Sequence, residues 1–188
     1  MRRALLRSLA CIALAAMATG CVTPAPAPEG PPRIVVVGAT ARSAKAIIAQ
    51  GLARGHEVVA IARRPEEVRT VHPKLTVLRG DVYDEASLAA GMARGDVVIC
   101  MVGPRVDPFT EVPPMDLFTT GTRNIIAAMK AKGSRRLLMA SSIGVENEVS
   151  TVKPDAMKEP CRVWLWNSRY LYKVMREMWG ICRASGRD

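Results

Sequence analysis

The pattern of apolar and polar positions from residue 33 onward alternates between short β-branched runs and longer helical repeats. The first run, Ile34 to Val37, is broken by glycine, and apolar residues then recur at three- and four-residue spacing as far as Leu52. A second run, Glu57 to Ile61, follows Gly55 closely, so the helix must return and place a parallel strand beside the first. The pattern predicts a βαβ unit over residues 33–64.

The same alternation continues to the end of the chain. Further strands are expected over Leu75 to Leu78, Asp96 to Val102 and Arg136 to Ala140. Helices are expected over Glu66 to Val71, Glu85 to Met92 with Asp84 as its cap, Met115 to Lys132 closed by Gly133, and Ser168 to Ala184. Strands that alternate with helices in this way predict an α/β, doubly wound parallel sheet of about five strands in the order 3-2-1-4-5. Its ligand crevice should lie beyond the carboxyl ends of the strands.

The turn between the first strand and the first helix, Gly38-Ala39-Thr40, is a candidate phosphate site. A helix N-terminus offers unpaired N–H groups, and a glycine there lets the main chain approach a pyrophosphate. Only the first glycine of the dinucleotide-binding pattern is present, because Ala41 and Ala44 occupy the other two positions. A purely structural turn therefore remains an alternative, although the βαβ context favours dinucleotide binding.

Composition narrows the choice of partners. The chain has 188 residues, 49% hydrophobic and 4% aromatic, which suits one domain with a core of small aliphatic side chains. The formal net charge is +10, but the basic residues are spread along the chain without a lysine-rich tail or a basic stripe interleaved with aromatic residues. Nucleic-acid binding is therefore not expected. The surplus positive charge agrees with an anionic cofactor or an anionic membrane surface.

The first 20 residues predict a signal peptide, with a basic start, an apolar run from Leu9 to Ala18 and small residues before Cys21. The stretch Ala18-Thr19-Gly20-Cys21 resembles the lipobox of bacterial lipoproteins, in which the cysteine is lipidated after cleavage. An ordinary cleavage site with an incidental cysteine is the alternative. Residues 21–32 are rich in proline and predict a semi-rigid tether. We therefore expect an exported lipoprotein anchored to the membrane through Cys21, on the periplasmic or outer side of a bacterium.

The export route stays open at this point. The pair Arg2-Arg3 resembles the twin-arginine export motif, which moves folded and cofactor-loaded proteins, and a routine basic start explains it equally well.

The remaining cysteines and histidines do not predict a metal site, because no pair of them has metal-ligand spacing. Cys100 falls in an apolar strand and is expected to be an inert buried thiol. Cys161 and Cys182 could form a disulfide in an oxidising compartment, although the sequence gives no distance between them. His56 and His72 stand alone in turns and are expected at the surface.

Six motifs occur in the order and spacing of atypical short-chain dehydrogenases/reductases, over about Arg33 to Gly186. The chain most resembles the NAD(P)H-binding group that includes NmrA-like proteins and biliverdin reductase B-type flavin reductases. The motifs are Gly38-Ala39-Thr40, Arg63-Arg64-Pro65, Gly80 to Asp84, Val98 to Gly103, Gly121 to Ile126 and Ser141 to Gly144. The resemblance implies a Rossmann fold over residues 33–188 that binds NADP(H).

The resemblance also implies a role for individual positions in holding the cofactor. The pyrophosphate turn would comprise Gly38, Thr40, Ala41, Arg42 and Ser43. The other cofactor contacts would be Arg63 and Arg64 with the 2′-phosphate, Asp81 and Val82 with adenine, and Met101, Val102 and Gly103 beside the adenosine. An acidic residue in place of the arginines would instead indicate NAD. Two alternatives remain: a solvated basic turn for the arginines, and a turn cap for Asp81.

Catalysis is less clearly implied than binding. Ser141 and Ser142 fall where the family approaches the nicotinamide, so a hydroxyl there could orient an acceptor or relay a proton, unless the serines only end a strand. The family usually carries a tyrosine four residues before a lysine, whereas Tyr170 and Tyr172 precede Lys173 by three and one. The expected activity is NADPH-dependent reduction of a small acceptor. The alternatives are a non-catalytic dinucleotide-binding sensor or assembly protein, and a degenerate product that binds nothing.

The end of the chain departs from the resemblance as well. The family continues with another strand and a region on the substrate side, but here the sequence stops at Asp188, so the Rossmann domain is expected to be incomplete at its C-terminus. The helix Ser168 to Ala184 presents an apolar stripe formed by Leu171, Val174, Met175, Met178 and Ile181. Together with an unpaired last strand, this stripe predicts self-association.

Overall fold

A five-stranded sheet, parallel throughout, forms the centre of the protein, with strand order β3-β2-β1-β4-β5. The computed structural model describes residues 30–103, 116–141 and 173–186. The strands are β1 Ile34–Val37, β2 Val58–Ala62, β3 Leu75–Arg79, β4 Val97–Cys100 and β5 Arg136–Met139. The predicted fold class and strand order are confirmed.

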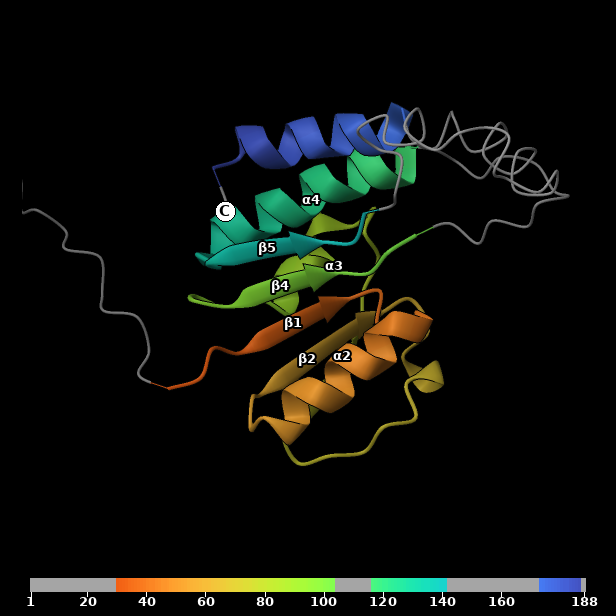
Figure 1. Cartoon of the computed structure of the whole chain (residues 1–188), viewed down its shortest axis with the longest axis vertical. Coiled ribbons are helices and arrows are strands. Elements are labelled where there is room, and N and C mark those ends of the chain that lie inside the picture. The colour runs from red at the N-terminus through yellow and green to blue at the C-terminus, as the bar shows by residue number, and fades with distance from the viewer. Residues whose placement is uncertain (1–29, 104–115, 142–172, 187–188) are drawn as a thin grey trace, which may run out of the picture.

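Helices cover both faces of this sheet (Figure 1). The β1–β2 connection is α2, Arg42–Ala53, which lies on one face; α3, Glu85–Ala90, and α4, Asp116–Lys132, connect β3 to β4 and β4 to β5 on the other. A helix of residues 173–184 lies beside α4 on that second face. Right-handed crossovers explain the division, since the chain moves outward from β1 in one direction and returns in the other.

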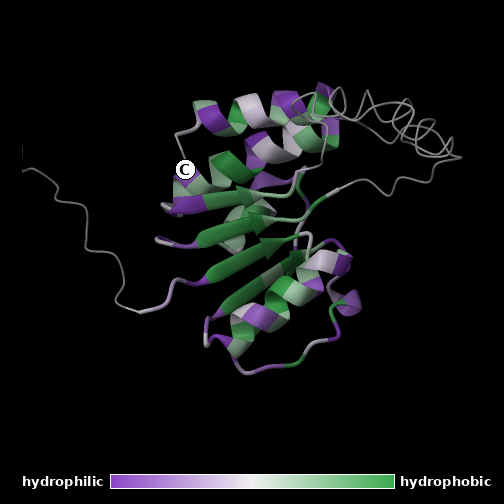
Figure 2. Ribbon diagram, in the orientation of Figure 1, coloured by the Kyte–Doolittle hydropathy of each residue, from purple (hydrophilic) through white to green (hydrophobic). Residues whose placement is uncertain are grey.

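The core consists of two layers of apolar side chains, one on each face of the sheet. The strands that carry these side chains are coloured green, as hydrophobic, in Figure 2. In β1, Val36 packs against the α2 side, whereas Val35 and Val37 pack against the α3 and α4 side, as the two-residue period of a strand requires. All five positions of β2 are buried. A strand enclosed on both faces needs apolar residues at every position, which is why the β2 sequence shows no polar alternation.

One predicted element is wrong. The expected helix over Glu66 to Val71 is a single 3-10 turn, η2 Pro65–Glu67, and Val71 is 96% exposed. The segment offers no apolar stripe to bury, its β-branched residues favour extended backbone, and Pro73 restricts the residue before it. The α3 helix also ends at Ala90, two residues earlier than expected, with Gly91 as its C-cap residue, where a side chain would come within 2.7 Å of Ile61 Cδ1.

A buried ion pair fastens the amino-terminal edge of the sheet. Arg33 donates from Nε to Asp96 Oδ1 at 3.0 Å and from Nη2 to Asp96 Oδ2 at 2.7 Å, and Asp96 is only 2% exposed. The Ala93 N–H group donates to the same carboxylate at 2.6 Å, and the Arg135 N–H group donates to the Asp96 carbonyl at 2.7 Å. The pKa of Arg33 is raised, chiefly by its hydrogen bond to Asp96. Asp96 therefore joins the start of β1 to the segments before β4 and β5.

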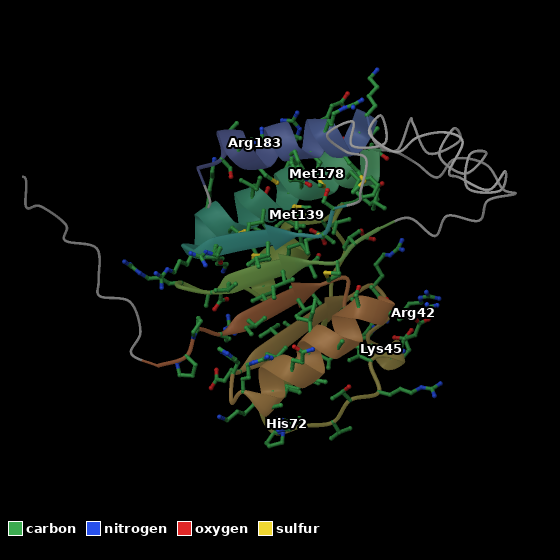
Figure 3. The ribbon with its side chains drawn as sticks, in the orientation of Figure 1. Arg42, Lys45, His72, Met139, Met178 and Arg183 are labelled. Carbon is green, nitrogen blue, oxygen red and sulfur yellow. The ribbon has the colours of Figure 1, made fainter. Side chains whose placement is uncertain are left out.

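The helix of residues 173–184 buries part of its predicted apolar stripe. Val174, Met175 and Met178 form a cluster with Phe118 of α4. Met139 of β5 packs against this cluster, and Figure 3 shows Met139 and Met178 in the layer between the strand and the helix. Leu171 of the predicted stripe lies outside the described residues, and within them no helix is both long and apolar enough to cross a membrane.

The two cysteines of the described part differ in environment. Cys100 of β4 is 3% exposed, which confirms that it is buried, and burial raises the pKa of its thiol to about 11. Cys182 is half-buried, and its Sγ lies 3.6 Å from Met139 Sδ. Cys161 lies outside the described residues, as do Cys21 and residues 1–20, so the proposed disulfide and the signal peptide stay predictions.

Candidate cofactor site

The turn after β1 needs glycine at position 38 for two reasons. Gly38 has a φ angle of +82°, in the left-handed region that disfavours side chains. A Cβ there would also lie 2.9 Å from Val102 Cγ2, 3.0 Å from the Val102 nitrogen and 3.1 Å from the Met101 carbonyl carbon. The turn and the end of β4 are thus in close contact. The structure brings these three predicted site residues together.

The N-terminus of α2 is uncapped. Its N-cap residue, Ala41, has extended dihedral angles and no side-chain hydrogen bond to the helix, and no acidic residue occurs in the first turn. In α3, by contrast, Asp84 accepts from the Ala86 and Ser87 N–H groups. The first N–H groups of α2 and the positive end of its dipole therefore remain available to an anion. At this end of the helix, Arg42 and Lys45 project outward in Figure 3.

Ala41 and Ala44, which occupy the second and third glycine positions of the dinucleotide-binding pattern, both pack in the core between α2 and the sheet. Ala44 is completely buried, which permits close packing of the helix on the sheet. Ala41 is half-buried and packs against the same apolar cluster. Its methyl group contributes to the cluster beneath α2, so the departure from the glycine pattern has a packing function.

The two predicted phosphate-binding arginines at the end of β2 are not equivalent. The Arg63 guanidinium is exposed and makes no hydrogen bond or ion pair with any residue in the described ranges. Arg64 pairs with Glu67, with 2.9 Å between Nη1 and Oε1. Arg79 pairs with Glu66 at 3.6 Å, so both nearby acids already face an arginine. The Arg63 guanidinium is therefore available to an external phosphate.

The end of β3 presents Asp81 and Val82 in a turn that is almost fully hydrogen-bonded. The Asp81 N–H group donates to Ser87 Oγ at 3.0 Å, and the Tyr83 N–H group donates to Asp81 Oδ1 at 3.1 Å. Asp81 thus caps its own turn, as the alternative proposed. Its Oδ2 atom and the Val82 N–H group have no hydrogen-bond partner among the described residues. Asp81 Oδ2 can accept a hydrogen bond from the amino group of adenine, and the Val82 N–H group can donate one to a ring nitrogen beside it.

Three further residues, Gly121, Asn124 and Tyr83, contribute to this part of the site, although no role was predicted for them from the sequence. Asn124 of α4 donates from Nδ2 to the Val82 carbonyl at 2.8 Å, and a Cβ at Gly121 would lie 3.2 Å from Val82 Cβ. The Tyr83 hydroxyl donates to Asp116 Oδ1 at 3.0 Å. The three-residue spacing of Gly121 and Asn124 places them on one helix face, a signal that could have identified both.

The nicotinamide end of the predicted site is represented by Ser141 alone, which is exposed just beyond β5. Ser142 lies outside the described residues. Gly103 is exposed, and a Cβ there would meet no atom within 4 Å, so the structure gives no steric reason for glycine at that position. No group of three possible metal ligands occurs within the described ranges. The described site is therefore mainly the adenosine and pyrophosphate half.

Comparison with known proteins agrees with this geometry. The NAD(P)H-binding family matches residues 38–185. Cinnamoyl-CoA reductase 1 of Oryza sativa subsp. japonica is 30% identical over 137 residues, covering 68% of this chain and 40% of that protein. An uncharacterized chloroplastic protein of Arabidopsis thaliana is 33% identical over 118 residues, covering 59% of this chain and 41% of that protein. The chain thus spans about two fifths of the length of these relatives.

Solved structures show the same fold at lower identity. The Bordetella bronchiseptica enzyme WbmH, in complex with NAD+, has a TM-score of 0.63 and 20% identity, covering 85% of this chain and 54% of that one. A Rossmann-fold NAD(P)-binding family protein from Shigella flexneri has a TM-score of 0.57 and 22% identity, covering 83% and 63%. This chain therefore belongs to the NAD(P)H-binding family, whose ligand is a nicotinamide dinucleotide, and it has the Rossmann fold of these solved structures.

Proposed function

We propose that the protein binds NADP(H) in preference to NAD(H) and is an NADPH-dependent reductase of a small acceptor. The observation that carries this proposal is the unpaired Arg63 guanidinium at the end of β2, where both neighbouring acids are paired with other arginines. A 2′-phosphate at this position gains a charge-assisted hydrogen bond from an arginine, whereas NAD selection needs a carboxylate for the ribose hydroxyls.

Different residues of the chain bind different parts of the cofactor. The first-turn N–H groups of α2, next to Gly38, bind the pyrophosphate, and Asp81 with Val82 binds the adenine edge. Met101 and Val102 form the wall beside the adenosine. The bound cofactor supplies the hydride, and a hydroxyl of Ser141 or Ser142 orients the acceptor. Small planar acceptors of the flavin or quinone kind suit hydride transfer that depends mainly on cofactor positioning.

A non-catalytic dinucleotide sensor is the second candidate. The described site holds groups for the adenosine half of the cofactor, while Ser141 alone stands at the nicotinamide end. The absorbance of NADPH, followed with a panel of flavin and quinone acceptors, distinguishes the two functions. Tight binding without consumption of NADPH by any acceptor would favour the sensor.

Replacing Arg63 with alanine should weaken NADPH binding about ten-fold or more and leave NADH binding nearly unchanged. A charge-assisted hydrogen bond to phosphate is worth about 1.5 to 3 kcal/mol, and only NADPH carries the phosphate. Titration by NADPH fluorescence measures both affinities. Arg64→Ala is the matched control and should have the smaller effect, because Arg64 is already paired with Glu67. Equal affinity of the unmutated protein for NADPH and NADH would contradict the assignment.

We also propose that the mature protein begins at a lipidated Cys21 and is held at a bacterial membrane. Cys21→Ser should release the protein from the membrane fraction or leave it unprocessed, because the serine provides no thiol for the lipid. Fractionation and intact mass measure the outcome. Cys11→Ser is the control and should leave the protein anchored, since Cys11 lies in the predicted signal peptide. A mature N-terminus other than lipidated Cys21 would refute this proposal.

A further inference from the structure

Tyr83 carries an exposed aromatic ring next to the residues proposed to bind the adenosine. The residue is 42% exposed, directly follows Val82 and belongs to the turn after β3. Its position is fixed at two points, because its N–H group donates to Asp81 Oδ1 at 3.1 Å and its hydroxyl donates to Asp116 Oδ1 at 3.0 Å. Asp116 is the first residue of α4, so the side chain connects two elements that meet at the carboxyl edge of the sheet.

Charged groups from both sides of this edge act on the Tyr83 phenol. Its pKa is raised, first by partial burial and then by the hydrogen bond and the negative charge of Asp116, with a further contribution from Asp81. Arg63 lowers the same pKa, so the guanidinium proposed to meet the 2′-phosphate lies within electrostatic reach of the phenol. The ring is thus close to the groups assigned to adenine and to those assigned to the phosphate.

The arrangement suits the binding of a planar ligand. A tyrosine that only packed would bury more of its ring, whereas this one leaves a large part in solvent and uses its hydroxyl to hold the ring in place. A ring that is fixed before binding loses little conformational entropy when a planar base stacks on it. Every purine has a π-face, and stacking on an aromatic side chain is a general way of binding one.

We propose that Tyr83 is the stacking residue for the adenine ring and that Asp116 acts as a positioning residue by holding the Tyr83 hydroxyl. This inference rests on the proposed dinucleotide-binding function and extends it to a particular contact. The Asp81 carboxylate and the Val82 N–H group read the edge of the base, while Tyr83 supplies a surface for its face.

Affinity measurements with whole and half cofactors test the proposal. The unmutated protein and each variant are titrated with NADPH, NADH, 2′,5′-ADP and reduced nicotinamide mononucleotide, which lacks adenine. Tyr83→Ala should raise the dissociation constants of the three adenine-containing ligands by a similar factor, about ten-fold. It should leave the affinity for the mononucleotide unchanged. Tyr83→Phe keeps the ring but loses the hydrogen bond, so its loss should be smaller, about two- to three-fold, and Asp116→Ala, which removes the acceptor, should match it.

The control is Val71→Ala, which truncates another exposed apolar side chain in the loop before β3 and should change none of the affinities. Circular dichroism establishes that each variant is folded, and Tyr83→Phe keeps the test possible if Tyr83→Ala is not. Unchanged affinity of Tyr83→Ala for 2′,5′-ADP would overturn the stacking role, as would an equal loss for the mononucleotide. Failure of the unmutated protein to bind NADPH would instead refute the proposed function, so the two failures are distinguishable.

Discussion

Replacing Asp96 with alanine should lower the free energy of unfolding by about 3 kcal/mol or more. The substitution removes a carboxylate that is 2% exposed and leaves Arg33 Nε and the Ala93 N–H group without their acceptor, while Arg33 Nη2 keeps only its longer hydrogen bond of 3.4 Å to the Gly91 carbonyl. Arg33 is itself 29% exposed, so water compensates part of the loss on its side. Urea denaturation followed by circular dichroism measures the change.

Arg64→Ala is the control for this experiment, because it breaks the exposed ion pair with Glu67 at a similar distance. Exposed pairs contribute little to stability, so this variant should unfold at nearly the same urea concentration as the unmutated protein. A similarly small effect for Asp96→Ala would show that the buried pair does not hold the amino-terminal edge of the sheet together.

Replacing Gly38 with alanine should both destabilise the fold and abolish measurable dinucleotide binding. The new methyl group would meet backbone atoms of Met101 and Val102 at 3.0 to 3.1 Å, so the turn after β1 and the end of β4 must separate. We expect a loss of about 2 to 4 kcal/mol, from backbone strain together with overpacking. The displaced turn would no longer direct the first N–H groups of α2 toward the pyrophosphate.

Gly55 provides a closely matched control for that substitution. Its φ angle of +83° is almost the same as the +82° of Gly38, but a Cβ there would meet nothing within 4 Å. Gly55→Ala should therefore show the cost of the left-handed backbone alone, about 1 kcal/mol, without loss of NADPH binding. If the two variants are equally stable and both bind NADPH, the contact between Gly38 and the end of β4 has no role in either property.

The strands and their order could be predicted because they depend on short apolar runs and on the handedness of crossovers. The β2 sequence is apolar at every position, as a strand buried on both faces requires. The start of α3 could be predicted because Asp84, its N-cap residue, directly precedes the helix. The end of β4 was placed too late, at Val102 rather than Cys100. The apolar run continues past Cys100, but Met101 and Val102 serve the contact with Gly38, which local sequence does not reveal.

The parts of the site that could not be predicted depend on side chains far apart in the sequence. Tyr83 and Asp116 are separated by 33 positions, and Arg33 and Asp96 by 63, so no periodicity connects the members of either pair. The resemblance to short-chain dehydrogenases/reductases treated Arg63 and Arg64 alike, and only the position of Glu67 distinguishes them. Local patterns determine which backbone elements form, whereas these pairings require the folded geometry.

The burial of Cys100 has a consequence for the chemical durability of the sheet. A thiol whose pKa is about 11 is ionised in roughly one molecule in ten thousand at pH 7. Oxidants and alkylating agents attack the thiolate, so we expect this buried side chain to react slowly with both classes of reagent while β4 stays in place. Strand β4 can therefore carry a cysteine without presenting a reactive thiolate.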